Sequence, residues 1–93
     1  MVLHIEALEI DEHILTKVES QHGVAFFEIE EACFSERQHV RRATEGVYKV
    51  FARTEAGRYL LIVLADHLGG RWKVVTAREM TDPEQRLYHR LVG

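Results

Sequence analysis

Three arginines stand at the ends of strand-like segments in the second half of the chain. Arg53 follows "YKVFA", Arg58 follows the turn at Gly57, and Arg78 follows "WKVVTA". A guanidinium group presents a planar fork of N–H donors that matches the oxygens of a phosphate group. Several such groups gathered in one place would bind a phosphorylated ligand and stabilise negative charge that develops during its reaction. The chemistry that these residues predict is therefore phosphate binding.

The strands that must position these arginines follow from hydrophobic alternation. From residue 39 onward the period of the pattern is two, and it predicts strands over residues 39–44, 47–54, 58–65 and 71–78. The turns between them contain glycine and are short, so neighbouring strands must be antiparallel. The segment 58–65 is apolar on both faces, and we expect it at the centre of the sheet.

Helices are expected on both sides of this strand region. Asp11 is the expected N-cap of a first helix that Gly23 ends, and the segment 24–34 predicts a second helix with an acidic outer face. A last helix begins within a residue of Asp82, with either Thr81 or Asp82 as its N-cap.

The predicted fold class is α+β: two N-terminal helices, a four-stranded antiparallel sheet and a C-terminal helix, in a single domain over residues 1–93. Partial alternation over residues 3–10 also allows a short edge strand before the first helix.

The register of the two hairpins decides whether the arginines meet. If Arg53 lies opposite Arg58 across the first turn, and Ala65 lies opposite Arg71 across the next loop, then Arg58 also lies opposite Arg78. The three arginines would form one row on one face of the sheet. A one-residue slip would move an arginine to the core face, where an unpaired charge is very costly.

The same expected face carries other candidate residues beyond the arginine row. Lys49 and Thr76 are candidates for substrate binding. Val47, Leu64 and Trp72 would form an apolar strip, and an exposed tryptophan is a frequent anchor of protein interfaces. We therefore predict that this strip binds a partner protein or a second copy of the chain. The alternative is that Trp72 packs under the last helix or the N-terminal segment.

Charge is distributed unevenly along the chain. Residues 1–36 carry nine acids and one base, a net charge of −8, whereas residues 37–93 carry six acids and eleven bases, a net charge of +5. One interpretation is that the two halves attract each other in the folded protein. The other is that the basic half meets an anion. The arginine row likewise has an alternative to phosphate binding: Glu55, Glu79 or the acidic second helix could neutralise it in a network of salt bridges.

Composition limits the remaining classes of site. The six histidines lack the close spacing of metal ligands, so no metal and no cofactor is predicted. Cys33 stands at a helical core position without a basic neighbour and is expected to be a buried thiol. A lone cysteine fits a reducing compartment, and the N-terminal stretch resembles neither a signal peptide nor a membrane span. We therefore expect a cytoplasmic protein.

Three stretches also resemble a known family. The segments "QHGVAFFEIEEACF", "YKVFARTEAGRYLLIVL" and "WKVVTAREMTDPEQRLYHR" are similar to the BrnT family of toxins, within the RelE and ParE superfamily. The similarity runs from about Asp11 to Arg90. It implies a small ribonuclease that inhibits translation and is held inactive by a cognate antitoxin.

The resemblance also implies roles for particular residues. Arg53, Arg58 and Arg78 match arginines of the family's motifs, and His22 matches the histidine of its "HGV" step. Cleavage would need no metal: the RNA 2′-hydroxyl would attack the adjacent phosphorus, with the arginines stabilising the added charge and His22 as the candidate general base. The alternative for His22 is that it interacts with the helix dipole at the end of the first helix.

A second hypothesis belongs to a different class. Ile10, Ile14, Val18 and Gln21 stand where family members often carry other, more polar residues. This favours a non-catalytic module on the same fold that binds a partner protein or itself.

Overall fold

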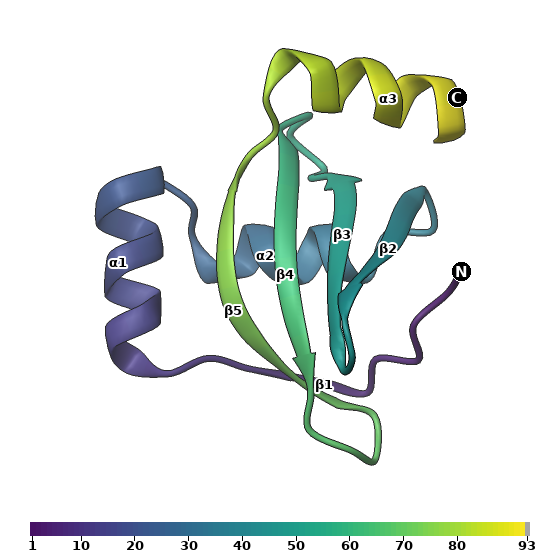
Figure 1. The fold of residues 1–93 in the computed structure, drawn as a ribbon. Coiled ribbons are helices and arrows are strands. Elements are labelled where there is room, and N and C mark those ends of the chain that lie inside the picture. The colour runs from purple at the N-terminus through teal and green to yellow at the C-terminus, as the bar shows by residue number, and fades with distance from the viewer. Residues whose placement is uncertain (93) are drawn as a thin grey trace.

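A five-stranded mixed sheet forms the centre of the protein (Figure 1). The computed structural model describes residues 1–92. Along the chain the elements are β1 (Ala7–Glu9), α1 (Glu12–His22), α2 (Phe26–Cys33), β2 (Gln38–Thr44), β3 (Val47–Arg53), β4 (Tyr59–Asp66), β5 (Arg71–Glu79) and α3 (Asp82–Val92). The strand order is β1-β5-β4-β3-β2, so β4 is central as predicted. The strands β2 to β5 form antiparallel neighbours.

The predicted four-stranded antiparallel sheet was incomplete, because β1 adds a fifth strand that pairs parallel with β5. Two ion pairs fasten this edge. Arg71 Nη2 lies 2.7 Å from Glu9 Oε2, and Lys73 Nζ lies 2.8 Å from Asp11 Oδ2. A three-residue strand whose partner is about sixty residues away leaves little trace in local periodicity, which is why the sequence allowed β1 without requiring it.

The helix boundaries follow the expected capping residues. Gly23 ends α1 in the left-handed conformation, with φ of 62°, and its N–H donates to the carbonyl of Glu19. At the start of α3, Thr81 and Glu84 form a reciprocal capping box: Thr81 N–H donates to Glu84 Oε1 at 2.8 Å, and Glu84 N–H donates to Thr81 Oγ1 at 3.3 Å. Thr81 is therefore the N-cap, the first of the two predicted alternatives.

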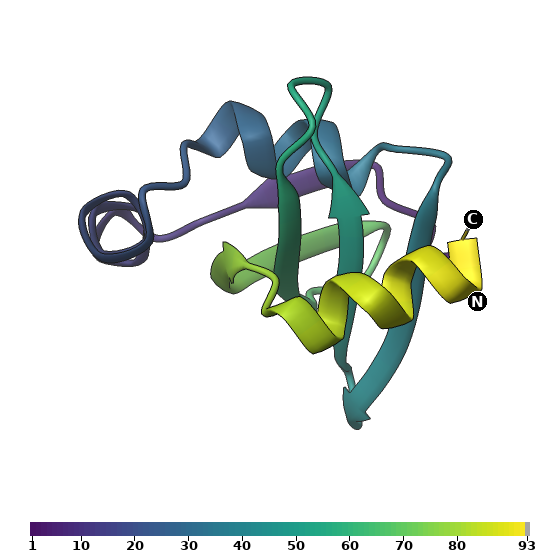
Figure 2. The ribbon, with the colours of Figure 1, turned by 90° about the horizontal axis from the view of Figure 1, so that it is seen from above.

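Helices cover both faces of the sheet. Viewed from above, α2 and α3 lie on opposite sides of the strands, and α1 lies beside β5 (Figure 2). The main core lies on the α1 and α2 side, where its largest fully buried side chains are Val18, Val24, Ile29, Val50, Leu60, Ile62, Leu64 and Val74. A smaller cluster under α3 contains Phe51, Leu61, Met80 and Tyr88.

The predicted register of both hairpins was wrong. Arg53 lies opposite Tyr59 rather than Arg58, because the connection spans Thr54 to Arg58. In the next hairpin Leu61 lies opposite Arg78, and an irregularity between Val63 and Leu64 shifts the ladder.

The new register also corrects the predicted core face. The predicted register placed Tyr59, Leu61 and Val63 with Val50 on one face of the sheet, as a core for the helices. Instead they lie on the α3 side, whereas Val50 belongs to the main core on the other side.

No helix among residues 1–92 is both long enough and apolar enough to cross a membrane.

Candidate functional site

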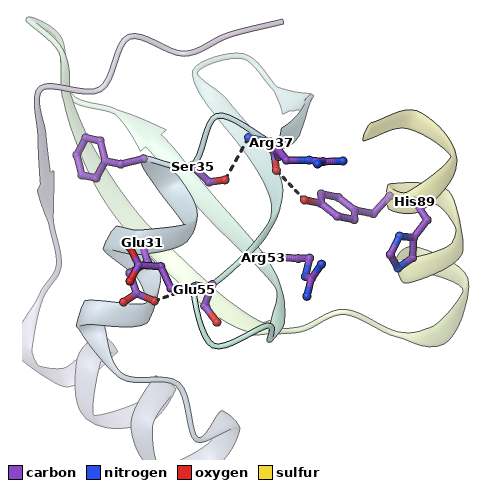
Figure 3. Close-up of a pocket in the computed structure, with 9 residues that line it drawn as sticks. Glu31, Ser35, Arg37, Arg53, Glu55 and His89 are labelled. Carbon is purple, nitrogen blue, oxygen red and sulfur yellow. Dashed lines mark hydrogen bonds between the residues drawn. The ribbon is translucent and has the colours of Figure 1, made fainter. Parts of the chain in front are cut away.

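An open pocket of about 630 Å³ lies where the end of α2, the end of β3 and the second half of α3 meet (Figure 3). It is lined by Glu31, Phe34, Ser35, Arg37, Arg53, Thr54, Glu55, Tyr88 and His89. Of the four predicted catalytic residues, Arg53 lines this pocket. The pocket is built at the edge of the smaller core cluster, so the packing of α3 on the sheet determines its shape.

Arg53 is the last residue of β3 and is exposed on the α3 side of the sheet. Its Cζ atom lies 4.9 Å from the centroid of the Tyr59 ring, directly across the hairpin. No ion pair of Arg53 occurs within the described part of the chain. A cation–π contact engages the face of the guanidinium and leaves its N–H donors able to bind an anion.

His89 meets the same tyrosine from α3. Its ring centroid lies 5.1 Å from that of Tyr59 and 5.9 Å from that of Tyr88. The Tyr88 hydroxyl donates a 2.6 Å hydrogen bond to the Arg37 carbonyl, and burial raises the pKa of this phenol. Tyr88 therefore fixes α3 to the start of β2, whereas the exposed imidazole of His89 faces the pocket (Figure 3).

The two ends of the pocket differ in charge. Arg37, Arg53 and His89 lie on the α3 side, and Glu31 and Glu55 lie on the α2 side (Figure 3). Arg37 also reaches the end of α3, where its Nη2 donates to the Val92 carbonyl at 3.3 Å. The arrangement suits an anion at one end and a hydrogen-bond donor at the other.

The acidic end has an ordered carboxylate. The backbone N–H of Glu55 donates to Glu31 Oε1 at 3.2 Å, which connects α2 to the turn after β3. Next to it, Phe34 closes α2 with 53% of its surface exposed. An apolar ring left in water at the mouth of a polar pocket can contact a planar ligand.

Arg58 lies on the other face of the sheet, so the predicted row of three arginines is wrong. Its Nη1 donates to both carboxylate oxygens of Glu28, at 2.8 and 3.0 Å, and to the Gly23 carbonyl at 2.9 Å. Its Nη2 donates to Glu79 Oε1 at 3.0 Å. Glu28, which was expected to point outward from α2, is buried because it neutralises this arginine.

Arg78 shares the α3 face with Arg53 but is held by a carboxylate. Its Nη1 and Nη2 donate to the two oxygens of Glu84 at 2.7 and 3.0 Å. These bonds hold the pKa of Glu84 at about 2, against 4.5 in its ordinary range. Most of the donor fork of Arg78 is therefore occupied by the first turn of α3.

The other predicted catalytic and substrate-binding residues lie outside the pocket lining. His22 is the exposed last residue of α1. Lys49 and Thr76 lie on the α3 face, joined by Val63 in one cross-strand row, at a part of the sheet away from the pocket. Their roles stay predictions.

The predicted apolar partner strip does not form. Trp72 lies opposite Asp66 and Val47 lies opposite Ala65, so neither lies opposite Leu64. Leu64 is fully buried, and Trp72 is 7% exposed.

The N-terminal segment accounts for the burial of Trp72. The indole Nε1 donates to the His4 carbonyl at 3.0 Å, and Leu3 and Ile5 pack against the same core. An edge-to-face contact with Tyr48 completes its surroundings. The alternative interpretation, in which the N-terminal segment covers Trp72, is the one that the structure shows.

Sequence reasoning missed Arg37 and His89 as residues of the site. Arg37 stands in the link before β2, and His89 stands in α3 between Tyr88 and Leu91, two of the residues expected to form the apolar side of that helix. The available signals were weak: Arg37 begins the basic half of the chain, and His89 follows the buried Tyr88.

Cys33 is buried, as expected, and burial raises the pKa of its thiol to about 12. Within residues 1–92, no group of three or more His, Cys, Asp or Glu side chains could hold a metal ion.

A solved structure has a fold similar to that of this chain. The chain is similar to the crystal structure of the ribonuclease toxin BrnT from Brucella abortus, with a TM-score of 0.69 and 12% sequence identity. The match covers 82% of this chain and 97% of that one. No family model matches the sequence, and no curated protein matches it. The likeness confirms the predicted BrnT-like fold.

Proposed function

We propose that the protein is an endoribonuclease toxin that cleaves single-stranded RNA in the pocket between α2, β3 and α3. The observation that carries the proposal is the juxtaposition of Arg53 and His89, which both lie about 5 Å from the Tyr59 ring. A cation whose donors are not used by a carboxylate lines the same pocket as an imidazole, the side chain that most often acts as a general base. Its fold is similar to that of a solved ribonuclease toxin, which supports the same conclusion.

In the proposed reaction the RNA supplies its own nucleophile. His89 removes the proton of a 2′-hydroxyl, the 2′-oxygen bonds to the adjacent phosphorus, and the bond to the 5′-oxygen breaks. The leaving oxygen takes a proton from water, and the products end in a 2′,3′-cyclic phosphate and a 5′-hydroxyl. Arg53 donates hydrogen bonds to the non-bridging oxygens, where negative charge increases in the transition state. This reaction needs no metal.

Arg58 and Arg78 take a different role in this proposal. Both are held by carboxylates, so they position the elements around the pocket rather than contact the phosphate. Arg78 anchors the start of α3, the helix that carries His89.

The test is cleavage of a short single-stranded RNA by the purified chain in the presence of a chelator. Arg53→Ala should lower the rate roughly 10²- to 10³-fold, the effect typical of removing one donor to a transition-state oxyanion. His89→Ala should lower it by at least about 10²-fold. Arg41→Ala is the matched control, because it removes an exposed arginine from β2 outside the pocket lining. All variants should keep the wild-type circular dichroism spectrum.

A second candidate function is a non-catalytic binding module, and the ion pairs of Arg58 and Arg78 favour it. Two of the three predicted phosphate-binding arginines are engaged inside the protein. Folded wild-type protein that leaves RNA intact under all ionic conditions, and does not slow growth when expressed, would refute the nuclease and support this module.

We also propose that a cognate antitoxin neutralises the protein in the cytoplasm by covering the pocket. The buried position of Trp72 removes the apolar strip as the docking surface. Protection of growth by a co-expressed small neighbouring gene product, together with loss of RNA cleavage in the purified complex, would support this proposal. Full RNA cleavage by that complex would contradict it.

A further inference from the structure

We infer that Glu31 and Phe34 form a base-recognition subsite that prefers guanine. The inference rests on the proposed RNA-cleaving function and adds the identity of the base. It starts from the charge difference between the two ends of the pocket: a phosphate would sit near Arg53, and the attached base would extend toward α2 (Figure 3). A volume of about 630 Å³ is in the range of pockets that hold a ligand of nucleotide size.

The carboxylate of Glu31 determines which base fits. An ionised carboxylate only accepts hydrogen bonds. The Watson–Crick edge of guanine places two donors, N1–H and the N2 amino group, side by side. Adenine and cytosine place one amino group beside an acceptor nitrogen, and uracil places one N–H between two carbonyls. A carboxylate therefore pairs with guanine through two bonds and faces a repulsive lone pair on each of the other bases.

Glu31 is held in place for such a contact. Its Oε1 atom accepts the Glu55 N–H at 3.2 Å, and no ion pair of Glu31 occurs within residues 1–92. The side chain is half-buried and lines the pocket. A carboxylate that is oriented by a backbone bond but not neutralised by a cation keeps acceptor capacity for a ligand.

Phe34 supplies the stacking surface. It lines the pocket and is 53% exposed, although an apolar ring of this size is usually covered. Proteins that bind single-stranded RNA stack unpaired bases on such aromatic rings and read their Watson–Crick edges with polar side chains. The two residues lie one helical turn apart at the end of α2, so one base can contact both.

The test measures binding without chemistry. The four 3′-mononucleotides, 3′-GMP, 3′-AMP, 3′-CMP and 3′-UMP, are titrated into the full chain and followed by NMR chemical shifts. We expect 3′-GMP to bind about tenfold more tightly than 3′-AMP, which is the discrimination typical of a two-bond contact to a base edge. Glu31→Gln should bring the two affinities within about threefold, since an amide presents one donor and one acceptor.

Two matched controls are present in the same helix. Glu30→Gln removes the same charge from a neighbouring exposed residue outside the pocket lining and should leave the preference intact. Phe34→Ala should weaken the binding of all four nucleotides by about tenfold. Phe27→Ala removes an exposed phenylalanine outside the pocket lining and should leave their affinities unchanged.

Equal affinity for the four mononucleotides, absence of binding, or a guanine preference that survives in Glu31→Gln would each overturn the inference. Its failure is separable from failure of the proposed function. RNA cleavage without base preference would retain the nuclease and reject the subsite. Selective binding of 3′-GMP by a protein that does not cleave RNA would retain the subsite and reject the nuclease.

Discussion

Arg58 lies at a position where a charged side chain is costly, and Glu28 is the reason that it can stay there. Glu28 is buried and Arg58 is half-buried, on the core side of the sheet. Burial alone would raise the pKa of Glu28, but hydrogen bonds from the Ala25 N–H and from Arg58 outweigh it and hold the pKa below its ordinary value. An arginine on this face was expected to be unpaired and therefore very costly, but the Glu28 carboxylate from α2 pairs with Arg58 and offsets that cost.

Arg58→Met should lower the free energy of unfolding by about 2 kcal/mol, because it leaves the Glu28 carboxylate buried without its cation. The measurement is urea denaturation followed by circular dichroism. Arg41→Met, at an exposed position of β2, should change the free energy of unfolding by less than about 0.5 kcal/mol. A similar small effect for both variants would show that the Arg58 ion pairs contribute no net stability.

The bidentate pair of Arg78 and Glu84 predicts a particular acid sensitivity. The pKa of Glu84 is depressed in the folded protein, from 4.5 to about 2, chiefly by hydrogen bonds from Arg78. A depressed carboxyl pKa contributes stability that is fully present above the unfolded value and is lost as the pH falls toward the folded value. This contribution should therefore disappear between about pH 4.5 and about pH 2.

Glu84→Gln should lower the stability of the protein near neutral pH and reduce its loss of stability over that acid range. The measurement is the free energy of unfolding as a function of pH for wild type and variant. Glu36→Gln, which changes an exposed carboxyl in the link before β2, should follow the wild-type curve. Parallel curves for wild type and Glu84→Gln would show that the Arg78–Glu84 pair does not cause the acid sensitivity.

At the scale of elements, the sequence predicted the presence and bounds of the antiparallel strands and the three helices within a few residues. It failed on how those strands align. Alternation identifies a strand but does not fix its partner's register, which depends on turns and bulges. Here the turn from Thr54 to Arg58 is closed by backbone bonds and by Thr54 Oγ1, which accepts the Arg58 N–H at 3.0 Å. The alternation of apolar residues gave no sign that Thr54 would be buried and would close this turn.

The capping box of α3 gives a prediction at the same scale. Thr81→Ala removes the side-chain acceptor of the Glu84 N–H and should lower the free energy of unfolding by about 1 kcal/mol. Thermal and urea denaturation measure the change. Ser20→Ala, at an exposed position within α1, is the comparison and should have little effect. Equal stability of Thr81→Ala and wild type would place the start of α3 under the control of packing rather than capping.

Across the whole molecule, the opposite charges of the two sequence halves attract each other, which is the first of the two predicted interpretations. The ion pairs of Arg71 with Glu9, Lys73 with Asp11 and Arg58 with Glu28 each join the acidic first part of the chain to the basic second part. Folding therefore uses part of the basic charge in ion pairs within the protein. Arg37 and Arg53 line the pocket.

The site itself was only partly predictable for a related reason. Arg53 was found from its place at the end of a strand, which is a local feature. Its neighbours Arg37 and His89 come from the link before β2 and from α3, and they line one pocket with Arg53 because α3 folds back over the sheet (Figure 2). Because these three residues come from separate parts of the fold, no fixed spacing in the sequence marks them as one site.

The hydrogen bond from Trp72 to the His4 carbonyl has a consequence for the order in which the chain folds. It joins residues 68 positions apart, whereas each hairpin of the sheet closes over a few residues. Closing the loop between His4 and Trp72 costs more chain entropy than closing a hairpin, and the three-residue β1 offers few hydrogen bonds to offset that cost. As the protein is synthesised, the segment with His4 and β1 must wait for β5, so β1 should dock last and detach first.

The fluorescence of Trp72, the sole tryptophan of the sequence, reports this detachment directly. In increasing urea, a red shift of its emission should precede the loss of sheet signal in circular dichroism. Coincident transitions would mean that β1 opens only when the whole domain does. Early opening would make the N-terminal edge the point at which a protease, or another strand, first gains access to the folded protein.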